Sequence, residues 1–231
     1  FAENGTGTVT DMGVTDVDAG DSHSFSLSGT DANLFNIDST TGVVTFKAAP
    51  DFESAGDDGG NNVYNFNVVV TDAGNNGAAL TDTQAITVTV TQANDAPIIT
   101  SNGGGDTASL SVDEGTTGTV VTVAATDADG DARTYSIVAG DDGADFAIDS
   151  TTGVVTFAST PDYEAPADGN TDNAYVLVVR ASDGNGGTDT QTLTISVDNI
   201  NEAPVISGTS TVSFAENGTG TVTDMGVTDV D

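Results

Sequence analysis

The sequence predicts an all-β chain built from tandem seven-stranded Greek-key β-sandwiches of immunoglobulin-like shape, arranged end to end. Three observations predict this class. The chain repeats itself, apolar and polar residues alternate over short runs, and turn residues separate those runs at spacings of roughly 8 to 15 residues. A length of 231 residues is enough for two domains, each with its own core.

The repeat is clearest at the two ends of the chain. Phe1–Asp18 returns letter for letter as Phe214–Asp231, a spacing of 213 residues. Between them, IDSTTGVVTF recurs from Ile37 to Ile148, a spacing of 111. Such internal similarity is typical of repeat proteins in which each period forms one structural unit.

These spacings define the predicted domains. We expect a first repeat over residues 1–97 that lacks the start of its first strand, a second over 98–204, and the N-terminal fragment of a third over 205–231. The chain opens with Phe1 rather than Met, so we expect an internal stretch of a longer protein. The identical ends also allow residues 205–231 to complete the first repeat of a neighbouring copy, by strand exchange or head-to-tail stacking.

Period-two alternation marks the strands inside each repeat. The inward positions of the longest runs are Tyr64, Phe66, Val68 and Val70 in the first repeat and Tyr175, Leu177, Val179 and Ala181 in the second. Alternation of this kind is typical of half-buried antiparallel strands. DSTTG, from Asp38 to Gly42, separates two apolar runs, and its glycine supplies the positive φ that a short hairpin turn needs.

The net charge of the chain excludes some classes of function. The formal net charge is −33, with only three Lys and Arg residues against 36 Asp and Glu. Such self-repulsion destabilises a compact state unless something neutralises it. The lack of a basic patch argues against nucleic acid as a partner, and the ordered alternation argues against a disordered acidic tail. We therefore expect a folded, cation-loaded chain, with no cysteine for disulfides and no membrane-inserted segment.

Carboxylates recur at fixed places in both repeats, at the ends of the predicted strands. The paired elements are AEN and DEG, DVD and DAD, PDFE and PDYE, VTDAG and ASDG, and QAND and NINE. A hard cation such as Ca²⁺ takes six to eight oxygen ligands, which several converging loops can supply. The ordered set, present twice, predicts calcium sites at the ends of the sandwiches.

In these elements and in their order, the chain resembles the cadherin repeat, in its bacterial cadherin-like variety. The resemblance covers essentially the whole chain. It implies calcium ions between consecutive repeats. The ligands that it implies at the first junction are Glu3, Asp51, Glu53, Asn94, Asp95, Asp127, Asp129 and Asp183. At the second junction they are Glu114, Asp162, Glu164, Asn199, Asn201, Glu202, Asp229 and Asp231, and at the outer end of the first repeat they are Asp16, Asp18 and Asp72.

The chain also departs from the family pattern. Gln92 and Asn199 replace the first linker Asp, and Phe52 and Tyr163 replace the Arg of the Asp-Arg-Glu segment. Glu202 replaces the second linker Asp, and the linker is one residue shorter before its Ala-Pro. Fewer charged ligands predict weak binding, roughly millimolar to sub-millimolar, or fewer ions at a junction.

The resemblance implies an extracellular, calcium-dependent adhesive or structural region of a surface protein, in which calcium stiffens a rod or fibre for cell adhesion or biofilm. The expected partners are calcium, adjacent repeats of the same protein and identical chains. A calcium-dependent polysaccharide-binding module is the alternative, although a chain without Trp has little from which to build an aromatic sugar platform.

Outside the predicted calcium sites, we expect structural roles rather than functional ones. Scattered acidic residues such as Asp57, Asp58, Asp141, Asp142 and Asp145 are expected to make turns. DADGDA from Asp127 begins like an EF-hand loop, but Ala132 and Val138 stand where Gly and the closing Glu belong. Paired carboxylates can hydrolyse glycosides, yet these pairs repeat at domain ends, so we expect no enzyme. The single histidine, His23, is expected to be a surface residue.

Overall fold

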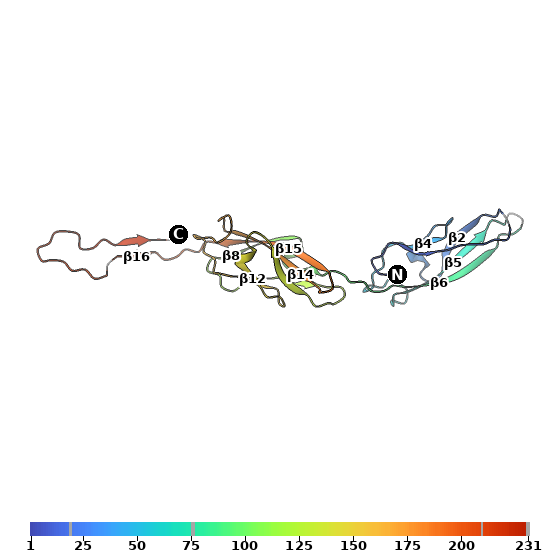
Figure 1. The fold of residues 1–231 in the computed structure, drawn as a ribbon, viewed down its shortest axis with the longest axis horizontal. Helices are drawn as coiled ribbons and strands as arrows, with labels where there is room; N and C mark the ends of the chain where they lie inside the picture. Colours follow the sequence, from blue (N-terminus) through green and yellow to red (C-terminus); the bar gives the residue numbers. More distant parts are fainter. Residues whose placement is uncertain (19, 75–76, 209, 230–231) are drawn as a thin grey trace. The chain divides into compact units, whose positions relative to one another are not determined.

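The computed structural model describes residues 1–18, 20–74, 77–208 and 210–229 (Figure 1). The chain divides into two compact units, unit 1 from Phe1 to Asn94 and unit 2 from Asp95 to Asp231. Within these ranges its regular elements are β-strands and three short 3-10 helices, so the all-β prediction is confirmed. Each unit is described by itself below.

In the described part of unit 1, the strands form two three-stranded sheets. One has the order β2-β5-β6, and the other has the order β1-β4-β3. The strands are β1 (Thr8–Asp11), β2 (His23–Ser28), β3 (Phe35–Ile37), β4 (Val43–Phe46), β5 (Val63–Asp72) and β6 (Thr81–Thr89). A 3-10 turn, η1 (Ala32–Leu34), precedes β3, and an isolated parallel bridge joins Ala2 to Thr91.

Unit 2 has the same plan with a fuller first sheet. Its main sheets have the orders β11-β14-β15-β8 and β12-β13-β9, seven strands in all, as predicted. The strands are β8 (Thr107–Asp113), β9 (Thr119–Thr122), β11 (Thr134–Ala139), β12 (Phe146–Ile148), β13 (Val154–Phe157), β14 (Ala174–Ser182) and β15 (Thr188–Asp198). Figure 1 shows β14 and β15 side by side, and β8 pairs in parallel with β15.

Smaller elements complete unit 2. β7 (Ile98–Ile99) pairs with β10 (Ala125–Thr126). The 3-10 helix η2 (Ser101–Gly103) follows β7, and the 3-10 helix η3 (Gly143–Asp145) precedes β12. Near the C-terminus, β16 (Val205–Ser207) pairs with β17 (Gly226–Thr228) in a two-stranded sheet whose residues are exposed.

The cores follow the alternation in the sequence. In β14, Tyr175, Leu177 and Val179 are at most 1% exposed and pack between the two sheets of unit 2. In β5, Tyr64, Phe66 and Val68 are at most 3% exposed. Aromatic contacts add to this packing, since the ring of Phe35 lies 4.4 Å from those of both Phe46 and Phe66.

The DSTTG turns position the β3–β4 and β12–β13 hairpins. Asp38 accepts hydrogen bonds from the backbone N–H groups of Thr40 and Thr41 at 2.8 Å. Gly42 closes the turn at φ 78°, and a Cβ there would lie 2.7 Å from the carbonyl oxygen of Met12. Gly153 occupies the same place in unit 2, at φ 71° and against the carbonyl of Val123. Glycine is therefore required twice over, by conformation and by space.

Candidate metal centres

A glutamate holds three chain segments together at one end of each unit. Glu3 is 3% exposed, and its two oxygens accept hydrogen bonds from the backbone N–H groups of Phe52 at 2.7 Å and Ala93 at 2.6 Å. Glu114 does the same in unit 2, with the N–H groups of Tyr163 at 2.9 Å and Ile200 at 2.6 Å. Each oxygen keeps a further lone pair, so this carboxylate can organise the loops and also bind a cation.

The PDFE and PDYE segments are fixed by their own aspartates. Asp51 accepts a hydrogen bond from the N–H of Ser54 at 2.8 Å, and Asp162 accepts one from the N–H of Ala165 at 2.9 Å. Both aspartates and the neighbouring Glu53 are exposed. The turns therefore present carboxylates to solvent.

Three predicted ligands converge in unit 2 at the end that carries Glu114. One carboxylate oxygen each of Glu114, Glu164 and Glu202 lies within 4.8 Å of the others. Asn199 donates its side-chain N–H to Oε1 of Glu164 at 2.7 Å, which adds a fourth predicted residue to the group. We call these three carboxylates the glutamate cluster.

A second group forms near the start of unit 2. Carboxylate oxygens of Asp127, Asp129 and Asp131 lie within 4.8 Å of one another, and we call them the aspartate cluster. The N–H of Asp95 donates to Oδ2 of Asp129 at 2.7 Å, which attaches the linker to the cluster. Asp131 was missed by the sequence argument, because the repeated element DAD ends at Asp129 and Asp131 lies two residues beyond it.

The aspartate cluster passes a simple test of fit for a hard cation. Oδ1 of Asp127 accepts the N–H of Asp131 at 3.1 Å, while its Oδ2 is buried and accepts no hydrogen bond within the described ranges. A buried carboxylate oxygen without a donor is costly unless a cation meets it. All three side chains are oxygen donors, the ligand type that calcium takes.

Asp183 is 6% exposed in the loop between β14 and β15. Its Oδ1 accepts hydrogen bonds from the backbone N–H groups of Asn185 at 2.7 Å and of Gly186 and Gly187 at 3.0 Å. The side chain of Asn185 also donates to Oδ2 of Asp131 at 2.6 Å. This loop is therefore joined to the aspartate cluster through Asn185.

At the other end of unit 1, Asp16 lies beside the histidine. His23 Nε2 and Asp16 Oδ2 are 2.9 Å apart, and the His23 side chain is only 19% exposed, so the expectation of a plain surface residue was incomplete. The N–H of Asp18 and then the imidazole hold the pKa of Asp16 below its usual value. Asp72 accepts the N–H groups of Gly74 and Leu80, and Asp18 is exposed.

The remaining predicted ligands are Asn94, Asn201, Asp229 and Asp231. Asn94 and Asp229 are exposed. Asn201 is also exposed, and its side chain donates to the carbonyl of Glu202 at 2.8 Å. Asp231 lies outside the described residues.

Other buried carboxylates have a structural role, as the turn interpretation expected. Asp57 is 6% exposed and accepts the N–H groups of Asn61 and Asn62, so it fixes the loop before β5. Asp142 is 5% exposed and accepts the N–H groups of Gly169 and Val176. Both are satisfied by backbone donors.

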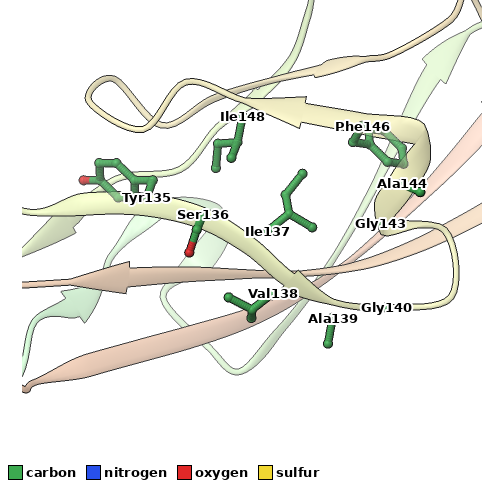
Figure 2. Close-up of a pocket in the computed structure, with 10 residues that line it drawn as sticks. All are labelled: Tyr135, Ser136, Ile137, Val138, Ala139, Gly140, Gly143, Ala144, Phe146 and Ile148. Atoms are coloured by element: carbon green, nitrogen blue, oxygen red, sulfur yellow. The ribbon is translucent and has the colours of Figure 1, made fainter.

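A surface hollow lies elsewhere, between the edge strands β11 and β12 of unit 2 (Figure 2). It is an open groove of about 600 Å³ lined by Tyr135 to Gly140, part of η3, Phe146 and Ile148. Its lining has no carboxylate, imidazole or amine side chain.

Comparison with known proteins gives the fold a family context. The cadherin domain model matches residues 108–198. Protocadherin Fat 1 of Homo sapiens is 35% identical over 200 residues, which cover 83% of this chain and 4% of that protein. The chain thus spans a small part of the curated relatives it matches.

Solved structures agree in fold. Drosophila N-cadherin EC1-4 is 24% identical with a TM-score of 0.54, covering 88% of this chain and 47% of that one. Human CDH23 EC21-23 is 21% identical with a TM-score of 0.55, covering 99% and 80%. These named matches are animal proteins, so the bacterial origin stays a prediction. Within the described residues no helix is long and apolar enough to cross a membrane.

Proposed function

We propose that this cadherin-like chain, whose residues 108–198 match the cadherin domain, is a calcium-dependent adhesive repeat region of an extracellular surface protein. Calcium ions bind between consecutive repeats and hold them end to end, so that a self-repelling chain becomes a stiff rod. The convergence of three carboxylates in the aspartate cluster carries the proposal.

The proposed junction takes ligands from both sides of residue 94. Unit 1 supplies Glu3, Asp51, Glu53 and Asn94, and unit 2 supplies Asp95, Asp127, Asp129 and Asp183. Support comes from each side separately. Glu3 is already fixed by two backbone donors, and Asp129 accepts the N–H of Asp95. We add Asp131 as a further ligand, on the side of unit 2.

The glutamate cluster is proposed to do the same at the far end of unit 2. Glu114, Glu164 and Glu202 would meet Asp162, Asn199 and Asn201 there, with Asp229 and Asp231 from the following segment. In unit 1, Asp16, Asp18 and Asp72 are the corresponding proposal for a preceding repeat.

Electrostatics supports this function. Three carboxylates within 4.8 Å repel one another unless a cation or a proton intervenes. The formal net charge of −33 means that the chain as a whole also needs cations to offset its self-repulsion. Divalent ions at the repeat ends would neutralise the places where carboxylates are densest.

Isothermal titration of calcium tests the proposal. We expect calcium to bind with dissociation constants of roughly 10⁻⁴ to 10⁻³ M, the extracellular range. Replacing Asp127 and Asp129 by Asn should remove the sites that include the aspartate cluster. Asp11→Asn, an exposed strand residue of the same charge, is the matched control. Unchanged binding after Asp127→Asn and Asp129→Asn would refute the assignment.

The more specific functional predictions are proposals as well. A role in a bacterial adhesin, fibre or biofilm follows only from the resemblance of the sequence. Polysaccharide binding is the alternative function, and a glycan array with and without chelator separates it from a purely structural role. Sedimentation at varied calcium tests homophilic adhesion between identical chains.

A further inference from the structure

The groove of about 600 Å³ between β11 and β12 lies between two sheet edges. In the described part of unit 2, β11 ends the sheet β11-β14-β15-β8 and β12 ends the sheet β12-β13-β9. Figure 2 shows the side chains of Ile137, Phe146 and Ile148 turned toward one another inside the groove, so its floor is apolar. Strand edges present backbone N–H and C=O groups to a further strand.

β11 contains one more residue than its counterpart β2 in unit 1. Phe25 and Tyr135 are equivalent, because the N–H of each donates at 2.9 Å to the serine carbonyl of the next DST turn. From Phe25 to Gly29 the chain advances four residues, whereas from Tyr135 to the equivalent Gly140 it advances five. The register of β11 against β14 shifts at this point, and that of β2 against β5 does not. The additional residue is Val138, which is 44% exposed. A bulge redirects side chains, and here it presents a valine rather than the charged residue that protects many edges.

Small residues open the groove on the side of η3. Gly143 and Ala144 stand where unit 1 has Ala32 and Asn33. A Cβ on Gly143 would lie 3.1 Å from Cγ2 of Ile137, so a side chain there would narrow the groove. Gly143 is not among the glycines with positive φ. The effect of this glycine is therefore to leave space rather than to allow a special backbone conformation.

The edge of β11 that faces away from β14 offers backbone hydrogen bonds. The N–H of Tyr135 points to this edge, since it donates to the carbonyl of Ser150 at 2.9 Å. Backbone groups alternate between the two edges along a strand, so Ile137 directs its N–H and C=O to the same edge. An extended peptide added here would gain main-chain hydrogen bonds and place alternate side chains on the apolar floor.

The two ends of the groove differ in charge. Asp142 precedes η3 and Asp145 ends it, and burial and then the charges of Asp142 and Asp168 raise the pKa of Asp145. Carboxylates therefore gather at this end. At the other end, the exposed Arg180 lies opposite Ser136 in the ladder. Complementary charges favour a partner with a basic residue beside η3.

We propose that this groove binds an extended peptide segment of another protein, with Val, Ile or Leu at alternate positions and Lys or Arg at its N-terminal end. The segment lies antiparallel to β11, the more stable orientation, and this places its N-terminal end beside η3. Residues from Tyr135 to Gly140 line one side of the groove, so a segment of about six residues, roughly 20 Å long, fills it. This interaction is separate from calcium binding, because the groove lining contains no carboxylate.

Hydrogen exchange of the full 231-residue chain with a synthetic peptide tests the proposal. The probe is acetyl-Lys-Lys-Val-Thr-Val-Ser-amide, and the control is the reversed sequence acetyl-Ser-Val-Thr-Val-Lys-Lys-amide, which has the same composition and charge. We expect the probe to slow exchange in fragments that contain Ile137 and to leave β2 of unit 1 unchanged. The reversed peptide should bind at least about threefold more weakly, because its lysines would lie beside Arg180.

A substitution in the groove provides the second test. Ala144 is exposed and lines the groove. Ala144→Arg fills part of the groove and repels the lysines of the probe, so binding should weaken at least about tenfold. Ala147→Arg is the matched control, because Ala147 is exposed on β12 and is not a lining residue. This variant should bind the probe like the wild type.

Four results would overturn the proposal. They are no protection of β11 by the probe at up to about 1 mM, where even a weak complex forms, equal binding of the probe and the reversed peptide, equal protection of β2 and β11, and equal effects of Ala144→Arg and Ala147→Arg. Protection of β11 that rises with protein concentration in the absence of peptide would assign the groove to a second copy of the chain, and would overturn the proposal as well.

Discussion

Replacing Glu3 by Gln separates the structural role of this carboxylate from its role toward calcium. The side chain is 3% exposed and accepts two backbone hydrogen bonds, at 2.6 and 2.7 Å. Glutamine has the same shape but one acceptor oxygen, so one N–H faces an NH₂ group. Losing a hydrogen bond to a charged acceptor costs about 1.5–3 kcal/mol, and a buried unsatisfied donor costs about 1–3 kcal/mol. These two effects overlap, and we expect unit 1 to lose about 2–4 kcal/mol.

Hydrogen exchange measured by mass spectrometry, in chelator, is the assay. Peptides from β5 report unit 1 and peptides from β14 report unit 2. A loss of about 2–4 kcal/mol speeds exchange in β5 roughly 30- to 700-fold, at 1.4 kcal/mol for each factor of ten, and leaves β14 unchanged. Asp11→Asn controls for the general relief of negative charge. Exchange in β5 that matches the control would refute the reasoning, because Glu3 would then matter only as a metal ligand.

Two other substitutions test the fold and its acid groups. Gly153→Ala should destabilise unit 2 by at least about 2 kcal/mol, since φ is 71° and the new Cβ meets the carbonyl of Val123; Gly118→Ala, with open space around it, should change the denaturation midpoint little, and equal effects would contradict the explanation. Burial and then the charges of Asp142 and Asp168 raise the pKa of Asp145 above its usual value, because the ionised form is disfavoured in the fold. The stability of the wild type therefore falls as the pH rises from below the pKa of Asp145 in the unfolded chain to above its raised pKa in the fold. Asp145→Asn should therefore stabilise unit 2 by about 0.5 kcal/mol at neutral pH, a scale that allows for solvent screening, and by nothing in acid; a gain that persists in acid would show another cause.

The strands could be predicted because their pattern depends on local alternation alone. Tyr175, Leu177 and Val179 point inward in the structure as the sequence indicates. The DSTTG turns followed from one glycine in each repeat. Such features need no knowledge of distant residues, because side chains on a strand alternate between faces wherever the strand lies.

The site was predicted in outline, and its details depended on contacts between distant segments. Nothing local to Glu3 shows that it accepts N–H groups from residues 52 and 93. His23 was predicted only to be a surface residue, because the sequence around it does not indicate its contact with Asp16. Asp131 was missed because the repeated element DAD contains only Asp127 and Asp129, whereas the fold of the loop also brings the carboxylate two residues further on into the same group.

Pulsed electron spin resonance between two labels tests most directly the claim that calcium joins neighbouring repeats. The chain has no cysteine, so Asn36→Cys in β3 and Ala147→Cys in β12, exposed and equivalent positions, can carry the labels. We predict a broad distance distribution in chelator that becomes narrow with calcium, and one that stays broad with calcium when Asp127 and Asp129 are Asn. Distributions of equal width with and without calcium would contradict the account.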